Sequence, residues 1–163
     1  MLRKLAARIF GFDEQIAELE EKIRELNWDT AYGMWTRGAF LQFCEVMPRG
    51  ERIVVFIDFD EIHLHNQEHG YAEVDRRIQA AFSVPFRSSD VVARWYSGDE
   101  MVILFDGDRD FAEGALRELE ASSHQSGLMF KYEIGVWEVG KRPIEEVVEE
   151  LSNQLTMQKS VHR

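Results

Sequence analysis

Two pairs of acidic residues carry the clearest chemistry in this sequence. Asp58 and Asp60 end an apolar, β-branched run that begins at Ile53, and Asp99 and Glu100 lie between two shorter apolar runs. The first run predicts a buried strand, and the second pair predicts the tip of a hairpin. If these strands pair, the carboxylates meet at one edge of a sheet, where a divalent cation would offset their repulsion. Hard oxygen ligands suit Mg²⁺, which often shares its shell with substrate phosphates, so the pattern indicates metal-assisted phosphoryl transfer.

Both acidic pairs also have a purely structural explanation. Acidic residues often follow strands, and Asp is frequent in turns for local reasons. The spacing alone therefore leaves two interpretations, a metal site and two ordinary strand ends. His63, His65 and His69 raise the alternative of a transition-metal site. His63 and His65, two positions apart, would face one metal ion only from an extended segment.

The elements around these residues predict a mixed central sheet flanked by helices. Because strands alternate with helices but include a hairpin, the fold class is α/β or, equally, α+β. Helices are expected over residues 37–47, 69–82, 110–121 and 144–159, and strands over residues 53–59, 91–96, 101–105 and 128–139.

A heptad pattern occupies the N-terminal segment. β-branched residues at position a with mostly Leu at position d favour a parallel two-stranded coiled coil. We predict a dimerisation helix over residues 1–27 and a separate domain over residues 28–163; the alternative is an amphipathic helix packed on its own domain. Position a holds Leu2, Ile9, Ile16 and Ile23, and position d holds Leu5, Phe12, Leu19 and Leu26.

The composition limits the classes of function. A formal net charge of -11 argues against a surface for nucleic acid or anionic membrane, although local basic residues and a metal ion can still hold a small phosphate ligand. No apolar run approaches the roughly 20 residues that span a bilayer. The single cysteine, Cys44, lies on an apolar stripe and cannot form an internal disulfide. We therefore expect a cytoplasmic protein with no nucleic-acid partner and no membrane anchor.

Several segments, taken in order, resemble the GGDEF family of diguanylate cyclases. SGDEM, residues 97–101, stands where the family has GGDEF, and residues 29–40 keep four positions of the family's D-x-L-T-G-L-x-N-R-x-x-F opening. Residues 56–75 follow the family's D-x-D-x-F-K-x-x-N-D-x-x-G-H-x-x-G-D stretch without a gap, and residues 133–136 resemble its S-I-G-V strand. The resemblance covers roughly residues 12–163. It implies a palm-like, ferredoxin-like domain preceded by a coiled-coil helix.

The resemblance also implies a role for each matching residue. Asp58, the carbonyl of Phe59, and Asp99 would hold Mg²⁺ or Mn²⁺. Glu100 would act with Asp58 and Asp99 in catalysis, supporting the metal site and the attacking 3′-hydroxyl group. Two further residues would read the guanine edge and five would contact the rest of the nucleotide. The guanine readers are Asn66 and Asp75, and the others are His63, Ser97, Gly98, Lys159 and Arg163.

One further motif and three departures from the family pattern matter for function. RSSD, residues 87–90, fits the family's R-x-x-D site, where Arg87 and Asp90 would bind cyclic di-GMP and limit synthesis. Its plainer interpretation is a surface pair ahead of a strand. Ser97 replaces a Gly and His63 replaces a Lys, changes that should slow the reaction or weaken GTP binding. One additional residue after Arg94 predicts a bulge that re-aims the turn and lengthens the distance to the R-x-x-D motif.

Three functional hypotheses follow. The first is a slow but active diguanylate cyclase that joins two GTP molecules at the interface of a homodimer. The second is a degenerate domain that binds GTP or cyclic di-GMP without turnover and passes a signal to a partner through the coil. The third is a palm enzyme that makes another cyclic nucleotide, against which Asn66 and Asp75 argue because they suit guanine. The remaining alternative is a purely structural dimer.

Overall fold

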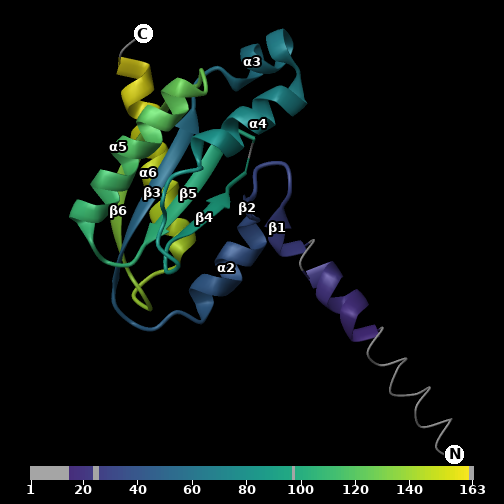
Figure 1. Cartoon of the computed structure of the whole chain (residues 1–163). Coiled ribbons are helices and arrows are strands. Elements are labelled where there is room, and N and C mark those ends of the chain that lie inside the picture. Colours follow the sequence, from purple (N-terminus) through teal and green to yellow (C-terminus); the bar gives the residue numbers. More distant parts are fainter. Residues whose placement is uncertain (1–14, 24–25, 97, 162–163) are drawn as a thin grey trace, which may run out of the picture.

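A six-stranded mixed sheet organises the chain in the computed structural model, which describes residues 15–23, 26–96 and 98–161 (Figure 1). The strand order is β1-β2-β4-β5-β3-β6, and among these described neighbouring strands only β2 and β4 pair in parallel. The strands are β1 (Trp28–Asp29), β2 (Met34–Trp35), β3 (Glu51–Phe59), β4 (Val91–Arg94), β5 (Glu100–Phe105) and β6 (Phe130–Glu138). The helices after the N-terminal segment are α2 (Arg37–Glu45), α3 (Ile62–His69), α4 (Tyr71–Ala81), α5 (Arg109–Gln125) and α6 (Ile144–Val161).

Strand β3 lies inside the sheet, between β5 and β6, and is buried on both faces. Its consecutive residues from Ile53 to Ile57 are each at most 5% exposed. Side chains alternate between the faces of a strand, so an unbroken apolar run is stable only where both faces are covered. The sequence predicted this buried strand from the same run, and the structure confirms it.

Helices cover both faces of the sheet and so complete three layers (Figure 1). On one face, Ile78 of α4 and Leu116 of α5 pack in one core with Val55 of β3. On the other face, α2 and α6 cover a second core, in which Val148 of α6 packs with Val54 of β3. Neighbouring residues of one strand therefore anchor two separate cores.

Local sequence signals set where the helices begin. The Thr36 side chain accepts a hydrogen bond from the backbone N–H of Ala39 at the start of α2, and Asp108 accepts one from Phe111 at the start of α5. Both are N-cap interactions that satisfy an otherwise unpaired amide. Gly70 joins α3 to α4 with φ of 83°, a conformation that favours glycine.

The predicted mixed sheet flanked by helices is confirmed, with element bounds that differ by a few residues. The helix predicted over residues 69–82 corresponds to α4, whereas the separate helix α3 over residues 62–69 was not predicted. Only Ile62 of α3 is buried, so its sequence lacks the apolar period that reveals a helix. Strands β1 and β2 were not predicted, since two residues each are too few to show alternation.

The N-terminal segment is helical over residues 15–23 and projects away from the sheet (Figure 1). Ile16, Leu19, Ile23 and Leu26 form the described part of the heptad pattern and are 51%, 58%, 55% and 73% exposed. These side chains therefore do not pack on their own domain, contrary to the amphipathic alternative. In the described part of the chain, no helix combines the length and apolarity required to cross a membrane. The other heptad positions, Leu2, Leu5, Ile9 and Phe12, lie outside the described residues.

Candidate functional site

The predicted acidic residues meet where the end of β3 lies beside the start of β5. Asp58 stands in register with Glu100, and the backbone N–H of Phe59 donates to the carbonyl of Asp99 at 2.8 Å. All three acidic residues are half-buried, so each backbone is fixed by the sheet while the carboxylate stays near solvent. The structure thus brings Asp58, Phe59, Asp99 and Glu100 together at one sheet edge, as strand pairing predicted.

The hairpin before this edge keeps a regular ladder. Arg94 pairs with Met101, and the N–H of Trp95 donates to the carbonyl of Glu100 at 2.8 Å. The bulge predicted from the additional residue is therefore absent from the described ladder, and that residue instead lengthens the segment after Trp95. The Arg37 guanidinium lies 4.7 Å from the centre of the Trp95 ring and fixes this end of the hairpin against α2.

The donor set at the edge suits one kind of metal site. Among the described residues, no three His, Cys, Asp or Glu side chains converge as a ready ligand cluster. That arrangement does not fit a closed, all-protein metal cage. Mg²⁺ commonly takes only one or two carboxylates and completes its shell with waters and phosphates. Asp58 and Asp99, with the carbonyl of Phe59, fit this open type of site.

The three histidines do not form a transition-metal site. His63, His65 and His69 all lie on α3, where residues two apart point in different directions. His65 and His69 stack with ring centres 6.3 Å apart. His63 is exposed at the start of the helix, where an imidazole can meet a phosphate group.

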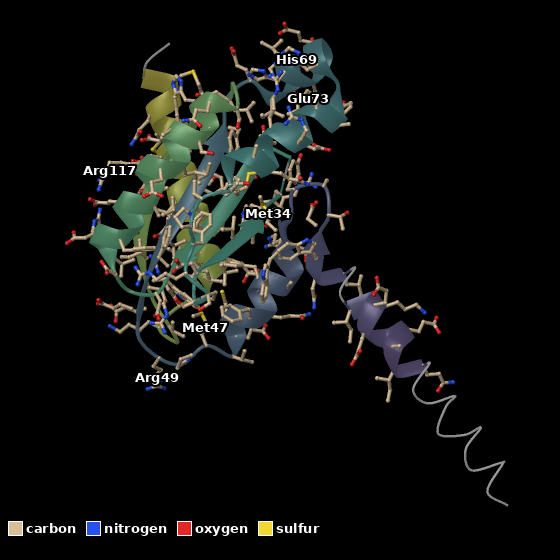
Figure 2. The ribbon with its side chains drawn as sticks, in the orientation of Figure 1. Met34, Met47, Arg49, His69, Glu73 and Arg117 are labelled. Carbon is tan, nitrogen blue, oxygen red and sulfur yellow. The ribbon has the colours of Figure 1, made fainter. Side chains whose placement is uncertain are left out.

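The helical pair α3–α4 carries the two predicted guanine readers. The chain reverses at Gly70, whose N–H donates to the carbonyl of Asn66 at 2.9 Å. Figure 2 shows His69 and Glu73 near the tip where α3 turns into α4. The Oδ1 atom of Asn66 is buried and has no hydrogen-bond partner within the described residues. A buried acceptor of this kind suits a ligand that donates a hydrogen bond.

The second predicted reader, Asp75, affects the ionisation of Tyr32. Burial raises the pKa of Tyr32 to about 12; Arg94 opposes this shift, whereas the charge of Asp75 and its hydrogen bond with the phenol add to it. A methyl group placed on Gly98 would lie 2.9 Å from the hydroxyl oxygen of Tyr32. The phenol hydroxyl therefore lies against the turn before β5, and its pKa responds to Asp75 on α4.

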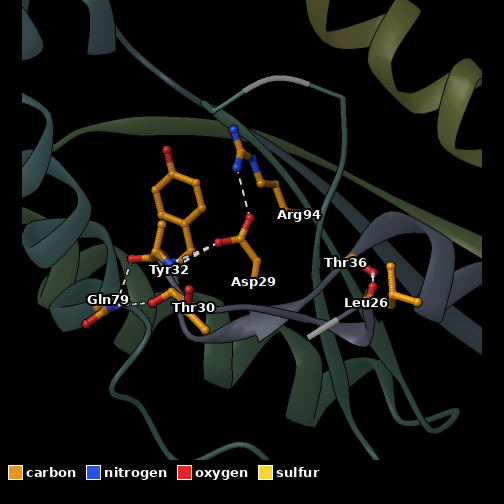
Figure 3. Close-up of polar contacts among 8 residues, drawn as sticks. Leu26, Asp29, Thr30, Tyr32, Thr36, Gln79 and Arg94 are labelled. Carbon is orange, nitrogen blue, oxygen red and sulfur yellow. Dashed lines mark hydrogen bonds and ion pairs between the residues drawn. The ribbon is translucent and has the colours of Figure 1, made fainter. Parts of the chain in front are cut away.

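A network around the β1–β2 hairpin holds Tyr32 in place (Figure 3). Asp29 accepts hydrogen bonds from the backbone N–H groups of Ala31 and Tyr32, at 2.9 and 3.2 Å. Its other oxygen pairs with Arg94 at 2.8 Å, and the Arg94 guanidinium lies 4.7 Å from the centre of the Tyr32 ring. Gln79 of α4 donates to the carbonyl of Ala31 at 2.7 Å.

Sequence reasoning missed Tyr32, although a signal was available. The residue stands where the family's D-x-L-T-G opening has Thr, so an aromatic ring replaces a small side chain. The retained Asp29 and Gly33 drew attention to the motif, but no pattern in the sequence placed this ring beside Asp75.

The R-x-x-D motif forms a closed turn ahead of β4. The Asp90 side chain is 0% exposed and accepts from the backbone N–H of Arg87 at 2.8 Å. The Arg87 guanidinium lies 3.4 Å from the centre of the Phe111 ring and 3.7 Å from Asp108. Within the described residues, Nε and Nη2 of Arg87 have no hydrogen-bond partner. The Arg87 guanidinium is thus held in ion pairs with Asp90 and Asp108, at 4.0 and 3.7 Å, and Asp90 also shapes the turn.

Three predicted nucleotide contacts fall where the structure gives no side-chain placement. Ser97 and Arg163 lie outside the described residues. Lys159 belongs to the backbone of α6, but its side chain is outside the described part. Their roles stay predictions from the sequence.

Two comparisons at the level of sequence found no match. No protein-family description fits this sequence, and no curated protein is significantly similar to it. The similarity of this chain to known proteins therefore comes from comparison of structures.

Solved structures with the same arrangement of helices and strands are GGDEF domains. The coiled coil and GGDEF domain of DgcB from Caulobacter crescentus, in complex with c-di-GMP, matches 98% of this chain and 94% of its own, with a TM-score of 0.82 and 18% identity. The diguanylate cyclase SiaD from Pseudomonas aeruginosa, with its activator SiaC, matches 98% and 68%, with a TM-score of 0.68 and 17% identity. The S helix-GGDEF-EAL region of Vibrio cholerae LapD matches 92% and 38%, with a TM-score of 0.71 and 16% identity. At these identities the likeness establishes the fold.

Proposed function

This chain has the fold of a GGDEF domain, and from that premise we propose that it joins two GTP molecules into cyclic di-GMP. The acidic sheet edge carries the proposal, because Asp58 is in register with Glu100 and Phe59 is hydrogen bonded to Asp99. Strand β3 runs directly into α3, so this edge adjoins the helix that bears the unpaired acceptor of Asn66.

The reaction requires two phosphodiester bonds. In each, the 3′-oxygen of one GTP attacks the α-phosphorus of the other and pyrophosphate leaves. Asp58, Asp99 and the carbonyl of Phe59 would hold Mg²⁺ or Mn²⁺, which when bound stabilises charge on the phosphate oxygens. Glu100, held in register beside Asp58, orients the attacking hydroxyl group.

Guanine is the base that this site selects. Its N1 and N2 groups donate hydrogen bonds, and both Asn66 Oδ1 and the Asp75 carboxylate accept them. Adenine would leave the half-buried carboxylate of Asp75 without the donors of guanine, which is the stronger form of discrimination. The rest of the nucleotide is contacted by His63, Ser97, Gly98, Lys159 and Arg163.

Two GTP sites must face each other, so the active form is a homodimer. The exposed apolar residues Ile16, Leu19, Ile23 and Leu26 continue the heptad pattern into the described helix. This supports a parallel coiled coil that holds the two domains together. Cyclic di-GMP would then limit its own synthesis by binding at Arg87 and Asp90, where a phosphate group would replace the 3.7 Å ion pair between Arg87 and Asp108.

One observation favours a second candidate, a domain that binds GTP or cyclic di-GMP without turnover and signals through the coil. The charge of Asp75, one of the two groups that would recognise the substrate, helps to raise the pKa of the buried Tyr32 phenol, so this side chain already interacts with a guanine reader. A site so engaged binds GTP more weakly than one that is open.

Incubation of the purified protein with GTP and Mg²⁺, with ATP in parallel, tests the proposal. Products are resolved by chromatography and mass. We expect cyclic di-GMP from GTP alone, and its loss in Asp99→Ala. Asp110→Ala, which removes an exposed acid from the first turn of α5, is the matched control and should keep activity. Nucleotide binding without product would select the second candidate, and neither binding nor product would contradict both.

A further inference from the structure

Arg37 contacts the segment that leads into the acidic turn. This residue is the first of α2, and its Nη2 atom donates to the hydroxyl oxygen of Tyr96 at 3.0 Å. The guanidinium lies 4.5 Å from the centre of the Tyr96 ring and 4.7 Å from the centre of the Trp95 ring. Both rings are therefore within the range of a cation–π contact. One side chain thus contacts two successive residues just before Asp99 and Glu100.

Tyr96 lies outside the hydrophobic core. The residue is 71% exposed, and it belongs to the segment after Trp95 that the additional residue lengthens. A longer connection has more backbone conformations to lose when it is ordered. Apart from Arg37, Tyr96 packs edge-on against Trp95, with ring centres 5.6 Å apart. The contacts with Arg37 therefore restrict a turn that burial alone does not fix.

Arg37 is itself fixed at both of its ends. Its guanidinium pairs with Glu145 of α6 at 3.3 Å, and its backbone follows Thr36, the N-cap of α2. The Thr36 hydroxyl also donates to the carbonyl of Leu26 at 2.9 Å (Figure 3). A guanidinium carries several donors in a rigid plane, so it can bond Tyr96 and Glu145 together. Arg37 therefore joins the turn to two helices.

The same residues border the acidic edge of the sheet. Trp95, Tyr96 and Glu100 line one cavity together with Glu145 and neighbouring residues of α6. The backbone N–H of Trp95 also donates to the carbonyl of Glu100 at 2.8 Å. A shift of Trp95 is therefore passed directly to the backbone of Glu100.

We propose that Arg37 is a positioning residue, which fixes the turn carrying Asp99 and Glu100 and thereby sets kcat; the inference rests on the proposed function. Phosphoryl transfer depends on placing the reacting groups, and a displacement of about 1 Å can cost about 100-fold in rate. The predicted guanine readers belong to α3 and α4, which are separate from this turn. Loss of Arg37 therefore lowers kcat and leaves the KM for GTP unchanged.

Two measurements on the full chain test the inference: steady-state kinetics with GTP at saturating Mg²⁺, and amide hydrogen exchange without nucleotide. We expect Arg37→Ala to lower kcat about 100-fold at constant KM, and to speed exchange over residues 95–101. Tyr96→Phe removes one hydrogen bond and keeps the ring on the guanidinium, so kcat should fall about fivefold. Arg109→Ala, which removes an exposed ion pair with Glu113 on α5, is the matched control and should change neither measurement.

Three outcomes would overturn the inference, and they are distinct. An unchanged kcat in Arg37→Ala, or a change confined to KM, would overturn it while leaving the proposed function intact. A lower kcat with unchanged exchange over residues 95–101 would show that other contacts fix the turn. No product from the wild type would overturn the proposed function, and this inference with it. If Arg37→Ala does not unfold cooperatively, Tyr96→Phe decides by the same two measurements, because Tyr96 is exposed.

Discussion

The ionisation of Tyr32 is opposed by its surroundings in the folded protein. Burial raises its pKa to about 12 from an ordinary value of 10.0, and the charge and hydrogen bond of Asp75 contribute. Because the folded pKa lies above the unfolded one, the stability linked to this phenol is complete below pH 10 and is lost as pH rises through 12. We expect the wild type to lose more stability than Tyr32→Phe over this window, measured as urea midpoints.

Phenolate absorbance in the near ultraviolet provides the accompanying check. Tyr32→Phe should lose one late-titrating phenol, and Asp75→Asn should lower the pKa of the one that remains at position 32. Tyr132 also has a raised pKa, chiefly from burial, so Tyr132→Phe is titrated alongside to separate the two. An equal number of late-titrating phenols in the wild type and in Tyr32→Phe would contradict the burial of Tyr32.

At the residue scale, the sequence predicted the acids of the site and missed the tyrosine. Asp58 and Glu100 were predictable because both follow from local strand patterns, and pairing of the strands brings them together. Tyr32 was not predictable, because its approach to Gly98 and the effect of Asp75 on its pKa join segments distant in sequence. The departure from Thr was visible, but the consequence depends on the approach of α4 to the hairpin.

Among the elements, the contact between β6 and α6 depends on Gly135. A methyl group placed there would lie 3.0 Å from Cδ2 of Leu151, a residue that is 4% exposed. We expect Gly135→Val to destabilise the protein by about 2 kcal/mol, since overpacking a core displaces side chains or backbone. The urea midpoint should fall while the dependence of unfolding free energy on urea stays unchanged.

Gly38 offers a control for the Gly135 substitution. It lies in α2, and nothing is within 4 Å of a methyl group placed there. Gly38→Ala should therefore stabilise the protein by about 0.5 kcal/mol, through reduced freedom of the unfolded chain. Equal urea midpoints for Gly135→Val and the wild type would show that α6 moves away from β6 without a loss of unfolding free energy.

The predictability of an element follows from how much apolar pattern it carries. Strand β3 and helix α5 were predicted because their own residues supply the buried faces. Helix α3 has one buried residue, Ile62, and takes its position from the end of β3 and from α4. No local pattern in the sequence indicates such tertiary support, which is why α3 was not predicted.

At the scale of the whole molecule, oligomeric state depends on the heptad face of the N-terminal helix. Ile16 is 51% exposed at position a, so an aspartate there would bury a charge in a coiled coil. We expect Ile16→Asp to reduce the mass measured by light scattering from dimer to monomer, and to reduce cyclic di-GMP formation with it.

Ala17 provides the matched control for this charge. It neighbours Ile16 on the same helix but lies outside positions a and d, and it is exposed. Ala17→Asp should therefore remain a dimer. Retention of the dimer in Ile16→Asp, or its loss in both variants, would contradict a coiled coil in this register.

The place of β3 in the sheet has a consequence for how the chain is made. Glu51 pairs with Glu138 and Phe59 with Phe130, so one side of this strand is completed by residues synthesised much later. A nascent chain leaving the ribosome therefore exposes the apolar run of β3 until β6 has emerged. Closing such distant pairs is slow, and an unpaired strand edge is prone to aggregation. During synthesis, we expect a chaperone to bind this exposed apolar strand.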